Sequence, residues 1–465
     1  MNIILLSGGS GKRLWPLSND IRSKQFIKFF KQENGEYQSM VQRIYGQIKA
    51  ADPDATVTIA TSRSQVSAIH NQLGDNVGIS VEPCRRDTFA AIALATAYLH
   101  DVQGVPEDEA VVVCPVDPYV EQSYFDCVKR LCERAAEGDR NLVLMGIKPT
   151  YPSEKYGYIV PASGKGAPNP ASSESAANGA SNFDGTNENA SSEAAAYTFT
   201  EKPSKEKAEE YIRQNALWNG GVFAYRLKYV LDKSKELLGT SDYSELFGNY
   251  ANLRKISFDY AVVEAESSIE VLIYDGEWKD LGTWNTLTEA INEPVIGDGV
   301  LNETCKNVHI VNELGIPILG MGLKDVVISA SPDGILVSDK EQSSYIKPFV
   351  DSFDQEIMFA EKSWGSYRVL DVEEGSMTVK VTLNPGHKMN YHSHEKRDEV
   401  WVVISGSGKT IVDSMEQRVK TGDVVTMEAG CKHTVIAGDE GLQMMEIQLG
   451  ESISVDDKHK YDMPE

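Results

Sequence analysis

The sequence has few cysteines and no long apolar run. Its 465 residues contain six cysteines, Cys84, Cys114, Cys127, Cys132, Cys305 and Cys431. They form no CxxC pair and no disulfide framework, so we expect a reducing, cytoplasmic location. No stretch approaches the roughly 18–20 apolar residues of a membrane helix. The start of the chain lacks the basic flank and cleavage site of a signal peptide.

Positive charge is also scarce. The 45 Lys and Arg residues face 69 Asp and Glu residues, for a formal net charge of −24. Because such a chain repels nucleic-acid phosphates and anionic lipids, we expect neither as a partner. Any phosphate site must therefore be a local cluster of cations. The 41% apolar content is ample for packed cores, and at roughly 150 residues per domain the length predicts two to four domains.

Apolar runs of strand length alternate with helical patterns through the first 160 residues. Buried strands are predicted at Ile3–Leu6, Val57–Ala60 and Ala110–Cys114. Helices are predicted at Ser39–Ala50 and Phe89–Leu99. Near-continuous apolar strands separated by helices are typical of a parallel sheet covered on both faces. The fold class predicted for this region is therefore α/β.

Residues 163–196 interrupt this pattern. The segment is mostly Ser, Ala, Gly, Asn and Glu and contains no Leu, Ile, Val or Met. Burial cannot offset the entropy cost of ordering such a segment, so we predict a disordered surface insertion. Regular structure is expected to resume at Tyr197 and to continue to about Glu293.

Two strand-rich regions follow. From Gly297 to Lys347, short strands recur roughly every eight to ten residues, which fits a β-helix or a small sandwich. After a charged link, the pattern from Trp364 onward is typical of an antiparallel barrel. The predicted domains are 1–293, 294–347 and 363–465, with a linker over 348–362.

A glycine-rich turn follows the first predicted strand, with the sequence Ser7-Gly8-Gly9-Ser10-Gly11-Lys12-Arg13. Such glycines let backbone N–H groups approach a phosphate closely. A Walker A loop would need glycine at Leu6 and a hydroxyl residue at Arg13, and a dinucleotide fingerprint would need glycine at Leu14. Neither standard motif therefore fits. The structural alternative is an ordinary strand-to-helix turn with surface cations.

The run from Gly9 to Leu17, with Lys24 beyond it, resembles the signature of the sugar-1-phosphate nucleotidyltransferases. The resemblance is closest to the guanylyltransferases that make GDP-mannose, which supply polysaccharide biosynthesis. Further matching segments follow in chain order: Glu82–Thr88, Cys114–Asp117, Gly157-Tyr158, Glu201–Pro203, Trp218–Gly221, Asp259-Tyr260 and Trp278–Trp284. The resemblance implies a Rossmann-like domain with a mixed, mainly parallel sheet.

The resemblance also implies substrates and residue roles. The substrates would be GTP and mannose 1-phosphate, and the products GDP-mannose and pyrophosphate. The implied nucleotide-binding residues are Leu6, Gly8, Gly9, Gly11, Glu82, Arg86 and Thr88. The implied sugar-phosphate residues are Gly157, Tyr158, Glu201, Lys202, Asn219 and Asp259. The implied catalytic residues are Arg13, Lys24, Asp117 and Asp280.

The implied reaction is an in-line displacement at phosphorus without a covalent enzyme intermediate. Asp117 and Asp280 would hold Mg²⁺ across the reacting phosphates. Arg13 would stabilise the leaving pyrophosphate, and Lys24 would neutralise the α-phosphate region.

The last predicted domain carries the pattern Gly386-(x)5-His392-Ser-His394-(x)4-Glu399, and a second half ends in His433. These segments resemble the two cupin motifs. His392 and His394 alternate on a predicted strand and so point to one face. With Glu399 and His433 they offer three imidazoles and one carboxylate to a divalent metal such as Zn²⁺ or Mn²⁺. A polar barrel interior without metal is the alternative.

In the guanylyltransferase family the attached cupin is often a mannose-6-phosphate isomerase. Arg397 matches an arginine of that family's Arg-Ala-Glu stretch, which implies a role in phosphate or enediolate stabilisation. A cupin that serves assembly or regulation remains the alternative. For the whole chain, the alternatives are the same fold acting on another sugar or nucleotide, and a non-catalytic sugar-nucleotide sensor. The edges of the β-rich regions would also allow a homodimer.

Overall fold

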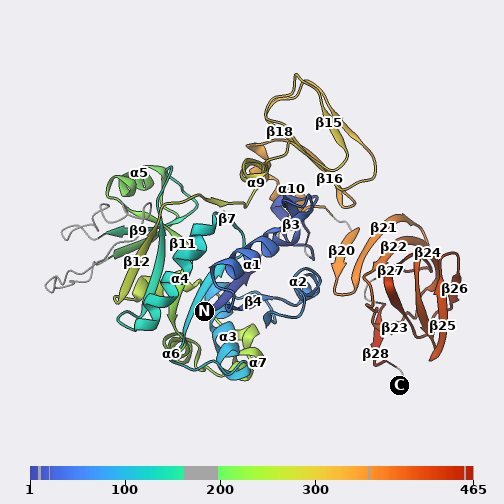
Figure 1. Cartoon of the computed structure of the whole chain (residues 1–465), viewed down its shortest axis with the longest axis horizontal. Helices are drawn as coiled ribbons and strands as arrows, with labels where there is room; N and C mark the ends of the chain where they lie inside the picture. The colour runs from blue at the N-terminus through green and yellow to red at the C-terminus, as the bar shows by residue number, and fades with distance from the viewer. Residues whose placement is uncertain (9–11, 20, 162–196, 354–356, 455–456, 464–465) are drawn as a thin grey trace. The chain divides into compact units, whose positions relative to one another are not determined.

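The computed structural model describes residues 1–8, 12–19, 21–161, 197–353, 357–454 and 457–463. Gly9, Gly11 and the predicted insertion over 163–196 therefore lie outside the described residues. The chain divides into two compact units, whose helices and strands are labelled in Figure 1. The first consists of Met1–Gly8, Ile44–Arg63 and Val77–Lys279, and the second of Gly9–Arg43, Ser64–Asn76 and Asp280–Glu465.

A nine-stranded sheet organises the first unit, with the order β10-β9-β11-β6-β1-β4-β5, while β8 pairs with β11 and β12. The strands are β1 (Asn2–Ser7), β4 (Thr56–Ser62), β5 (Gly78–Glu82), β6 (Ala110–Pro115), β8 (Leu142–Ile147), β9 (Gly157–Pro161), β10 (Tyr197–Glu201), β11 (Leu217–Arg226) and β12 (Ile269–Tyr274). The short strand β7 (Pro118–Val120) pairs with β13 (Trp278–Asp280). Strand β1 runs parallel to both β4 and β6, whereas β11 runs antiparallel to β6, β8 and β9. The sheet is therefore mixed.

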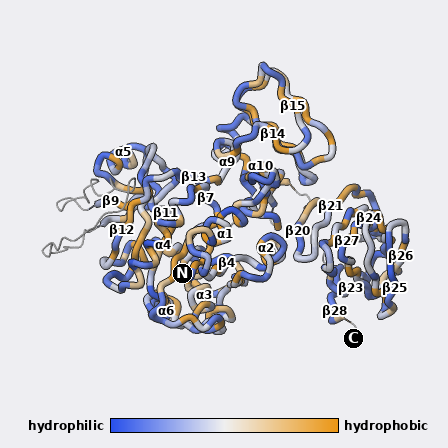
Figure 2. The backbone as a smooth tube through the Cα atoms, in the orientation of Figure 1, coloured by the Kyte–Doolittle hydropathy of each residue, from blue (hydrophilic) through white to orange (hydrophobic). Residues whose placement is uncertain are grey.

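Helices cover this sheet. They are α3 (Asp87–Ala97), α4 (Gln122–Glu137), α5 (Lys205–Arg213), α6 (Leu227–Leu238), α7 (Tyr243–Gly248) and α8 (Phe258–Ala261), while α1 (Met40–Ala51) belongs to both units. All residues of α3 from Phe89 to Ala97 are buried, as expected of a helix that is apolar on every side. It ends in a single π-helical turn, Tyr98–Val102. The predicted strands and helices of this region are confirmed, and Figure 2 shows hydrophobic residues concentrated around β4 and β11.

The second unit contains a small β-helix. Its strands are β14 (Val295–Ile296), β15 (Gly299–Leu301), β16 (His309–Asn312), β17 (Ile318–Gly320), β18 (Val326–Ser331) and β19 (Gly334–Asp339). β14, β16 and β18 pair in parallel, and so do β15 and β17. Parallel pairing of strands from successive turns is the arrangement of a β-helix rather than of an antiparallel sandwich. The structure thus decides between the two predicted alternatives.

The other short elements of this unit come from several parts of the chain. They are β2 (Lys28–Lys31), β3 (Tyr37–Ser39), α2 (Val66–Leu73), α9 (Trp284–Ala290), α10 (Lys347–Val350) and the 3₁₀ turns Lys12–Leu14 and Lys24–Phe26. The indole N–H of Trp284 donates to the carbonyl of Trp15 at 3.0 Å. This bond joins the start of α9 to the segment that follows the glycine-rich turn.

An antiparallel nine-stranded sheet forms the C-terminal barrel. Its strands are β20 (Phe359–Lys362), β21 (Gly365–Glu373), β22 (Ser376–Leu383), β23 (Tyr391–Ser393), β24 (Asp398–Val412), β25 (Met415–Lys420), β26 (Val424–Met427), β27 (His433–Leu449) and β28 (His459–Tyr461). β24 is a single strand of 15 residues that continues through Gly406. Gly406 makes this continuity possible: its φ is +77°, and a Cβ there would lie 2.2 Å from the carbonyl oxygen of Gly441.

Strand β20 pairs with β21, so Phe359–Lys362, at the end of the predicted linker, belong to the barrel sheet. The predicted domain boundaries stay a prediction. Among the described residues, no helix has the length and apolar character needed to span a membrane.

Candidate functional site

The carboxyl edge of the parallel strands gathers the first group of predicted site residues. Leu6 of β1 pairs with Pro115 of β6, and the N–H of Val116 donates to the carbonyl of Leu6 at 3.3 Å. Asp117 follows Val116 directly, and the exposed Gly8 follows the end of β1. Open α/β sheets bind ligands at this edge. The ends of β1 and β6, which the sequence pattern singled out, therefore lie side by side.

Glu82 ends β5 and faces Tyr250, whose hydroxyl donates to Glu82 Oε2 at 2.8 Å. Burial raises the pKa of Glu82, although the bond from Tyr250 acts in the opposite direction. Arg86 donates to the carbonyl of Ala251, and the hydroxyl of Thr88 accepts from the N–H of Phe258 at 2.9 Å. The side chains of Arg86 and Thr88 thus hold neighbouring backbone, and Glu82 is the member of this segment whose carboxylate is positioned by a hydroxyl.

The predicted sugar-phosphate residues form one cluster in the first unit. Asn219 Nδ2 donates to Asp259 Oδ1 at 2.6 Å, and Lys202 Nζ lies 2.8 Å from Glu201 Oε1. Gly157 pairs with Glu201 across β9 and β10, and a Cβ on this glycine would meet Glu201 Oε2 at 2.6 Å. Glycine is therefore required at position 157 for the carboxylate to lie where it does.

Electrostatics in this cluster favour a proton on one carboxylate. Burial raises the pKa of Asp259 to about 6, the charge of Glu201 adds to this effect, and the bond from Asn219 opposes it. The pKa of Lys202 is raised, chiefly by its bond to Glu201. The structure places Tyr158 differently from its neighbours, because its buried hydroxyl bonds to the backbone of Ser153. The side chain of Tyr158 therefore supports the fold rather than facing a ligand.

Two predicted catalytic residues meet in the second unit. Lys24 Nζ lies 3.9 Å from Asp280 Oδ1 and 3.4 Å from the carbonyl oxygen of Leu281. Arg13 is exposed in the preceding 3₁₀ turn. Asp117 belongs to the first unit and Asp280 to the second, so their joint role as ligands of Mg²⁺ stays a prediction.

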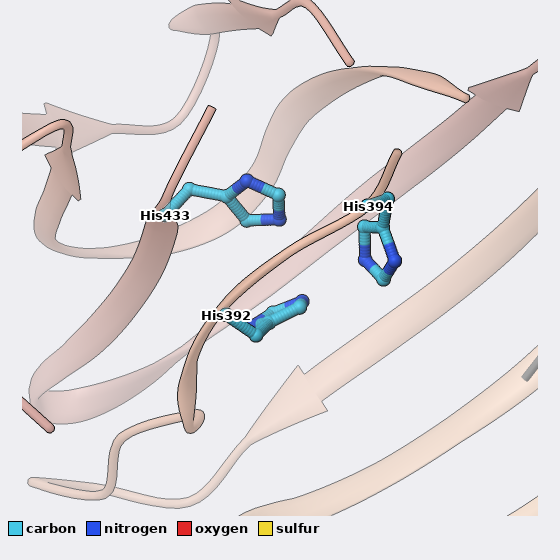
Figure 3. Close-up of side chains that lie close together, drawn as sticks. All are labelled: His392, His394 and His433. Carbon is cyan, nitrogen blue, oxygen red and sulfur yellow. The ribbon is translucent and has the colours of Figure 1, made fainter. Parts of the chain in front are cut away.

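The barrel brings three histidines together (Figure 3). His392 on β23 and His433 on β27 are a cross-strand pair with ring centroids 4.4 Å apart, and His394 lies 4.9 Å from His392. One nitrogen of each ring lies within 4.8 Å of the others. All three side chains are buried. The alternation of His392 and His394 predicted from the sequence is therefore confirmed.

The second nitrogen of each ring fixes its orientation. Nδ1 of His392 is 2.6 Å from the carbonyl oxygen of Asn390, Nδ1 of His433 is 3.0 Å from that of Cys431, and Nδ1 of His394 bonds the carbonyl of Asp457. A carbonyl only accepts, so each Nδ1 carries the proton and each Nε2 presents a lone pair. Burial and the nearby charges of Lys458 and His433 lower the pKa of His392 to about 2, which keeps this ring neutral.

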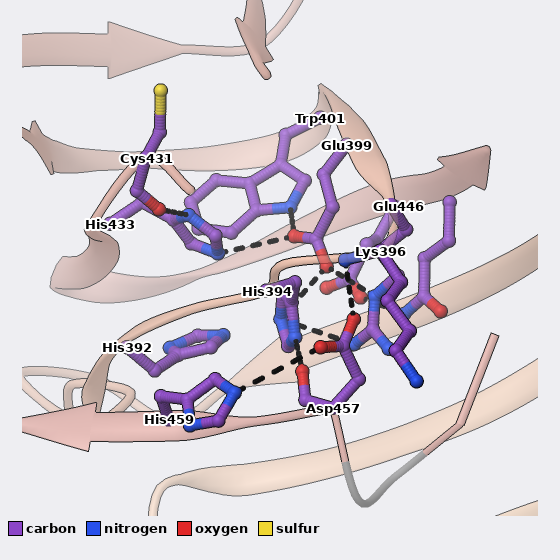
Figure 4. Close-up of polar contacts among 12 residues, drawn as sticks. His392, His394, Lys396, Glu399, Trp401, Cys431, His433, Glu446, Asp457 and His459 are labelled. Atoms are coloured by element: carbon purple, nitrogen blue, oxygen red, sulfur yellow. Dashed lines mark hydrogen bonds and ion pairs between the residues drawn. The ribbon is translucent and has the colours of Figure 1, made fainter. Parts of the chain in front are cut away.

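Glu399 lies against two of these rings (Figure 4). Its Oε1 is 3.1 Å from Nε2 of His394, and its Oε2 is 3.3 Å from Nε2 of His433. Arg397 Nε and the indole N–H of Trp401 donate to this carboxylate, at 3.2 and 3.1 Å. The predicted fourth ligand is therefore beside the histidines, and two donors anchor it.

A cavity of about 440 Å³ opens beside His392 and His394 inside the barrel. It is lined by side chains that sequence reasoning missed, among them Lys362, Glu446, Gln448, Lys458 and Lys460. Gln448 Nε2 donates to Glu446 Oε1 at 2.5 Å. The available signal for this pair was its spacing of two residues along a strand, which puts Glu446 and Gln448 on the same face.

Comparison with known proteins agrees with this geometry. The model of the nucleotidyl transferase family matches residues 2–294, and that of the mannose-6-phosphate isomerase C-terminal family matches residues 353–463. The xanthan biosynthesis protein XanB of Xanthomonas campestris is 26% identical, over 98% of this chain and 96% of its own. The mannose-1-phosphate guanylyltransferase 2 of Escherichia coli O157:H7 is 26% identical over the same shares, 98% and 96%.

A solved structure is also similar. The crystal structure of a Thermus thermophilus protein described as a mannose-1-phosphate geranyltransferase superposes with a TM-score of 0.58 at 27% identity. It covers 75% of this chain and 98% of the solved chain.

Proposed function

Because the chain belongs to the nucleotidyl transferase family, we propose that it transfers a guanylyl group from GTP to mannose 1-phosphate and releases pyrophosphate. The observation that supports this proposal is the parallel pairing of β1 with β6, in which Leu6 lies opposite Pro115, two residues before Asp117. Relatives of nearly equal length bear the name mannose-1-phosphate guanylyltransferase. Their coverage extends over both the sugar-phosphate cluster and the barrel.

The chemistry is a direct displacement. A phosphate oxygen of mannose 1-phosphate attacks the α-phosphorus of GTP, and the bond to the β,γ-pyrophosphate breaks. Lys24 and Arg13 neutralise charge that develops on the reacting phosphates. Asp117 and Asp280 offer the hard carboxylate oxygens that Mg²⁺ prefers, and a bound Mg²⁺ would supply charge neutralisation across the phosphates. Positioning and electrostatics then account for catalysis.

Two groups of residues in the first unit select the nucleotide and the sugar phosphate. Glu82 presents a carboxylate oriented by Tyr250, and a carboxylate matches the N1–H and N2 amino donors of guanine. Asn219, Asp259 and Glu201 offer acceptors and donors to sugar hydroxyls, and Lys202 adds a cation for the phosphate. The bond between Asn219 and Asp259 fixes both side chains before the sugar arrives.

Pyrophosphate release tests this function. The purified chain with Mg²⁺ is given GTP, ATP, UTP or CTP, each with mannose 1-phosphate or glucose 1-phosphate. Release that depends on both GTP and mannose 1-phosphate supports the proposal. Equal pyrophosphate release with another nucleotide and sugar phosphate would support the same mechanism but assign other substrates. No release from folded protein would favour the sugar-nucleotide sensor.

A second function is favoured by the three-histidine group and its cavity. The barrel interconverts fructose 6-phosphate and mannose 6-phosphate, a reaction that moves a proton between C2 and C1 of the sugar. His392, His394 and His433 present three Nε2 lone pairs and Glu399 a carboxylate, a donor set that fits Zn²⁺ or Mn²⁺. A bound metal would polarise the sugar carbonyl. The test is conversion of fructose 6-phosphate without added GTP, followed by a coupled assay of the product.

The cellular setting follows from the substrates. GDP-mannose is a precursor for polysaccharides, and nucleotides and sugar phosphates are found in the cytoplasm, where we place this chain. A homodimer remains a proposal, to be tested by the mass of the purified protein in solution.

A further inference from the structure

The cavity in the barrel has an excess of positive charge in a chain whose net charge is −24. Four cationic side chains line it, those of Lys362, Arg397, Lys458 and Lys460, and Glu446 is its one acidic lining residue among the described residues. Because the protein as a whole repels anions, a local cationic cavity is a selective place for one.

The guanidinium of Arg397 already makes hydrogen bonds to other groups of the protein. Its Nη1 donates to the carbonyl of Ser454 at 2.9 Å, its Nη2 lies 3.1 Å from Nε2 of His394, and its Nε donates to Glu399. The bond from Nε holds the carboxylate of Glu399 in place beside the histidines. Arg397 is therefore a positioning residue of the three-histidine group, and the three lysines are the cations left for a ligand.

Two of the three lysines, Lys362 and Lys458, lie in surroundings that disfavour their charge. Burial lowers the pKa of Lys362, and the neighbouring charge of Lys460 lowers it further. Burial also lowers the pKa of Lys458, although the charges of Glu446 and Glu399 act in the opposite direction. Within the part of the chain that the structure describes, no carboxylate oxygen is within ion-pair distance of any of the three amines. Burial of an ammonium group is costly, and an incoming phosphate would offset that cost at Lys362 and Lys458.

Lys458 is held at a defined place relative to the histidines. The carboxylate of the preceding residue, Asp457, accepts the N–H groups of Glu395 and Lys396, both at 3.0 Å. The carbonyl of Asp457 also accepts from Nδ1 of His394. One residue therefore ties the backbone at Lys458 to the loop that follows His394. A ligand bound at both ends would span a fixed distance.

We propose that Lys458, with Lys362 and Lys460, binds the phosphate of a hexose 6-phosphate whose carbonyl end lies at the three histidines. This assignment rests on the isomerase function proposed above. Glu446 and Gln448, hydrogen-bonded to each other inside the cavity, face the sugar hydroxyls. A volume of about 440 Å³ is in the range of small-ligand pockets, which the phosphate and the sugar ring fill together.

Calorimetric titration of the full chain with fructose 6-phosphate tests the assignment. The variants are Lys458→Gln, which removes the charge, Lys458→Arg, which keeps it, and Lys420→Gln, an exposed lysine of β25 outside the cavity. Loss of one charge-assisted contact should weaken binding about 10- to 100-fold in Lys458→Gln. Lys458→Arg should recover most of the affinity, and Lys420→Gln should match the parent. Mannose, inorganic phosphate and GDP are titrated in parallel.

The outcomes separate the phosphate site from the reaction. Unchanged affinity in Lys458→Gln, or mannose binding as tightly as fructose 6-phosphate, would overturn the assignment. Binding of GDP that also depends on Lys458 would overturn it in favour of a nucleotide site. Lys458-dependent binding of fructose 6-phosphate without isomerisation would uphold the phosphate site and reject the isomerase. Isomerisation that does not depend on Lys458 would uphold the isomerase function and overturn the phosphate assignment.

Discussion

Nε2 of His433 lies 3.3 Å from Oε2 of Glu399, and both side chains are buried. Because Nδ1 of His433 donates its proton to the carbonyl of Cys431, the facing atoms of the two residues are both acceptors. Two buried acceptors at this distance repel each other unless a cation lies between them or a second proton is bound. A divalent metal held by Glu399 and the three histidines meets this requirement.

The first prediction concerns metal and stability. Dialysis against a chelator should lower the thermal unfolding midpoint of the barrel, and Zn²⁺ or Mn²⁺ should restore it, because a metal that binds only the folded state stabilises it. At 100 times the dissociation constant the gain is about 2.7 kcal/mol. Differential scanning calorimetry with and without metal measures it.

A matched pair of histidine variants shows whether the metal binds at the three histidines. His433→Ala should lose bound metal, while His387→Ala, an exposed residue of the same domain, should retain it. Elemental analysis of both proteins gives the stoichiometry. Equal metal content in the two variants, or no metal in either the parent or its reloaded form, would contradict the site.

The second prediction concerns Lys24. Replacing Lys24 by Gln removes the charge that faces the reacting phosphates and should lower kcat for pyrophosphate release on the order of 10²–10³-fold. Lys28→Gln changes an exposed lysine of β2 in the same segment and should leave kcat near that of the parent. Steady-state kinetics of the two variants make the comparison. A similar small effect in both would remove Lys24 from the catalytic group.

The third prediction concerns the nucleobase. Glu82→Gln keeps the shape of the side chain but loses the charge that matches the guanine N–H groups. We expect kcat/KM for GTP to fall about 10- to 100-fold, with much less effect on the slow reaction of ATP. Competition between GTP and ATP measures the ratio directly. Unaltered preference for GTP would show that other groups recognise the base.

The fourth prediction concerns pH. Because the pKa of Asp259 is raised to about 6 in the folded chain, the folded state holds a proton that the unfolded state has released. The contribution of this group to stability is thus present below about pH 4, the ordinary pKa range of aspartate, and is lost as the pH rises through 6. Asp259→Asn should therefore flatten the dependence of unfolding free energy on pH between 4 and 6.

Denaturant unfolding at several pH values measures this difference. Asp298→Asn, which removes an aspartate remote in sequence from the sugar-phosphate cluster, controls for the loss of one negative charge. An unchanged slope between pH 4 and 6 in Asp259→Asn would refute the raised pKa.

Local sequence patterns predicted much of the fold and part of the candidate site. Ile3–Leu5 are completely buried, which is why a continuous apolar run predicted a central parallel strand correctly. His392 and His394 were predicted to share a face because a strand has period two. The choice between β-helix and sandwich depended on which strands pair, such as β16 with β18, and composition does not determine register.

Contacts between segments that are distant in the chain could not be predicted from local sequence patterns. Glu446 and Lys458 reach the cavity only because β27 and the C-terminal segment fold around it, and no spacing relates either residue to His392. Lys24 and Asp280 are separated by most of the first unit in sequence, and only the family resemblance linked them. Tyr250 reaches Glu82 from a 3₁₀ turn, with no signal in the sequence around either residue.

The central claim is that this chain makes GDP-mannose, and pyrophosphate release from GTP and mannose 1-phosphate tests it most directly. Purified full chain with Mg²⁺ should release pyrophosphate only when both substrates are present, and GDP-mannose should accumulate in equal amount. Omission of Mg²⁺ should abolish release. Absence of release from folded, Mg²⁺-supplied protein, or release that is indifferent to mannose 1-phosphate, would contradict the account.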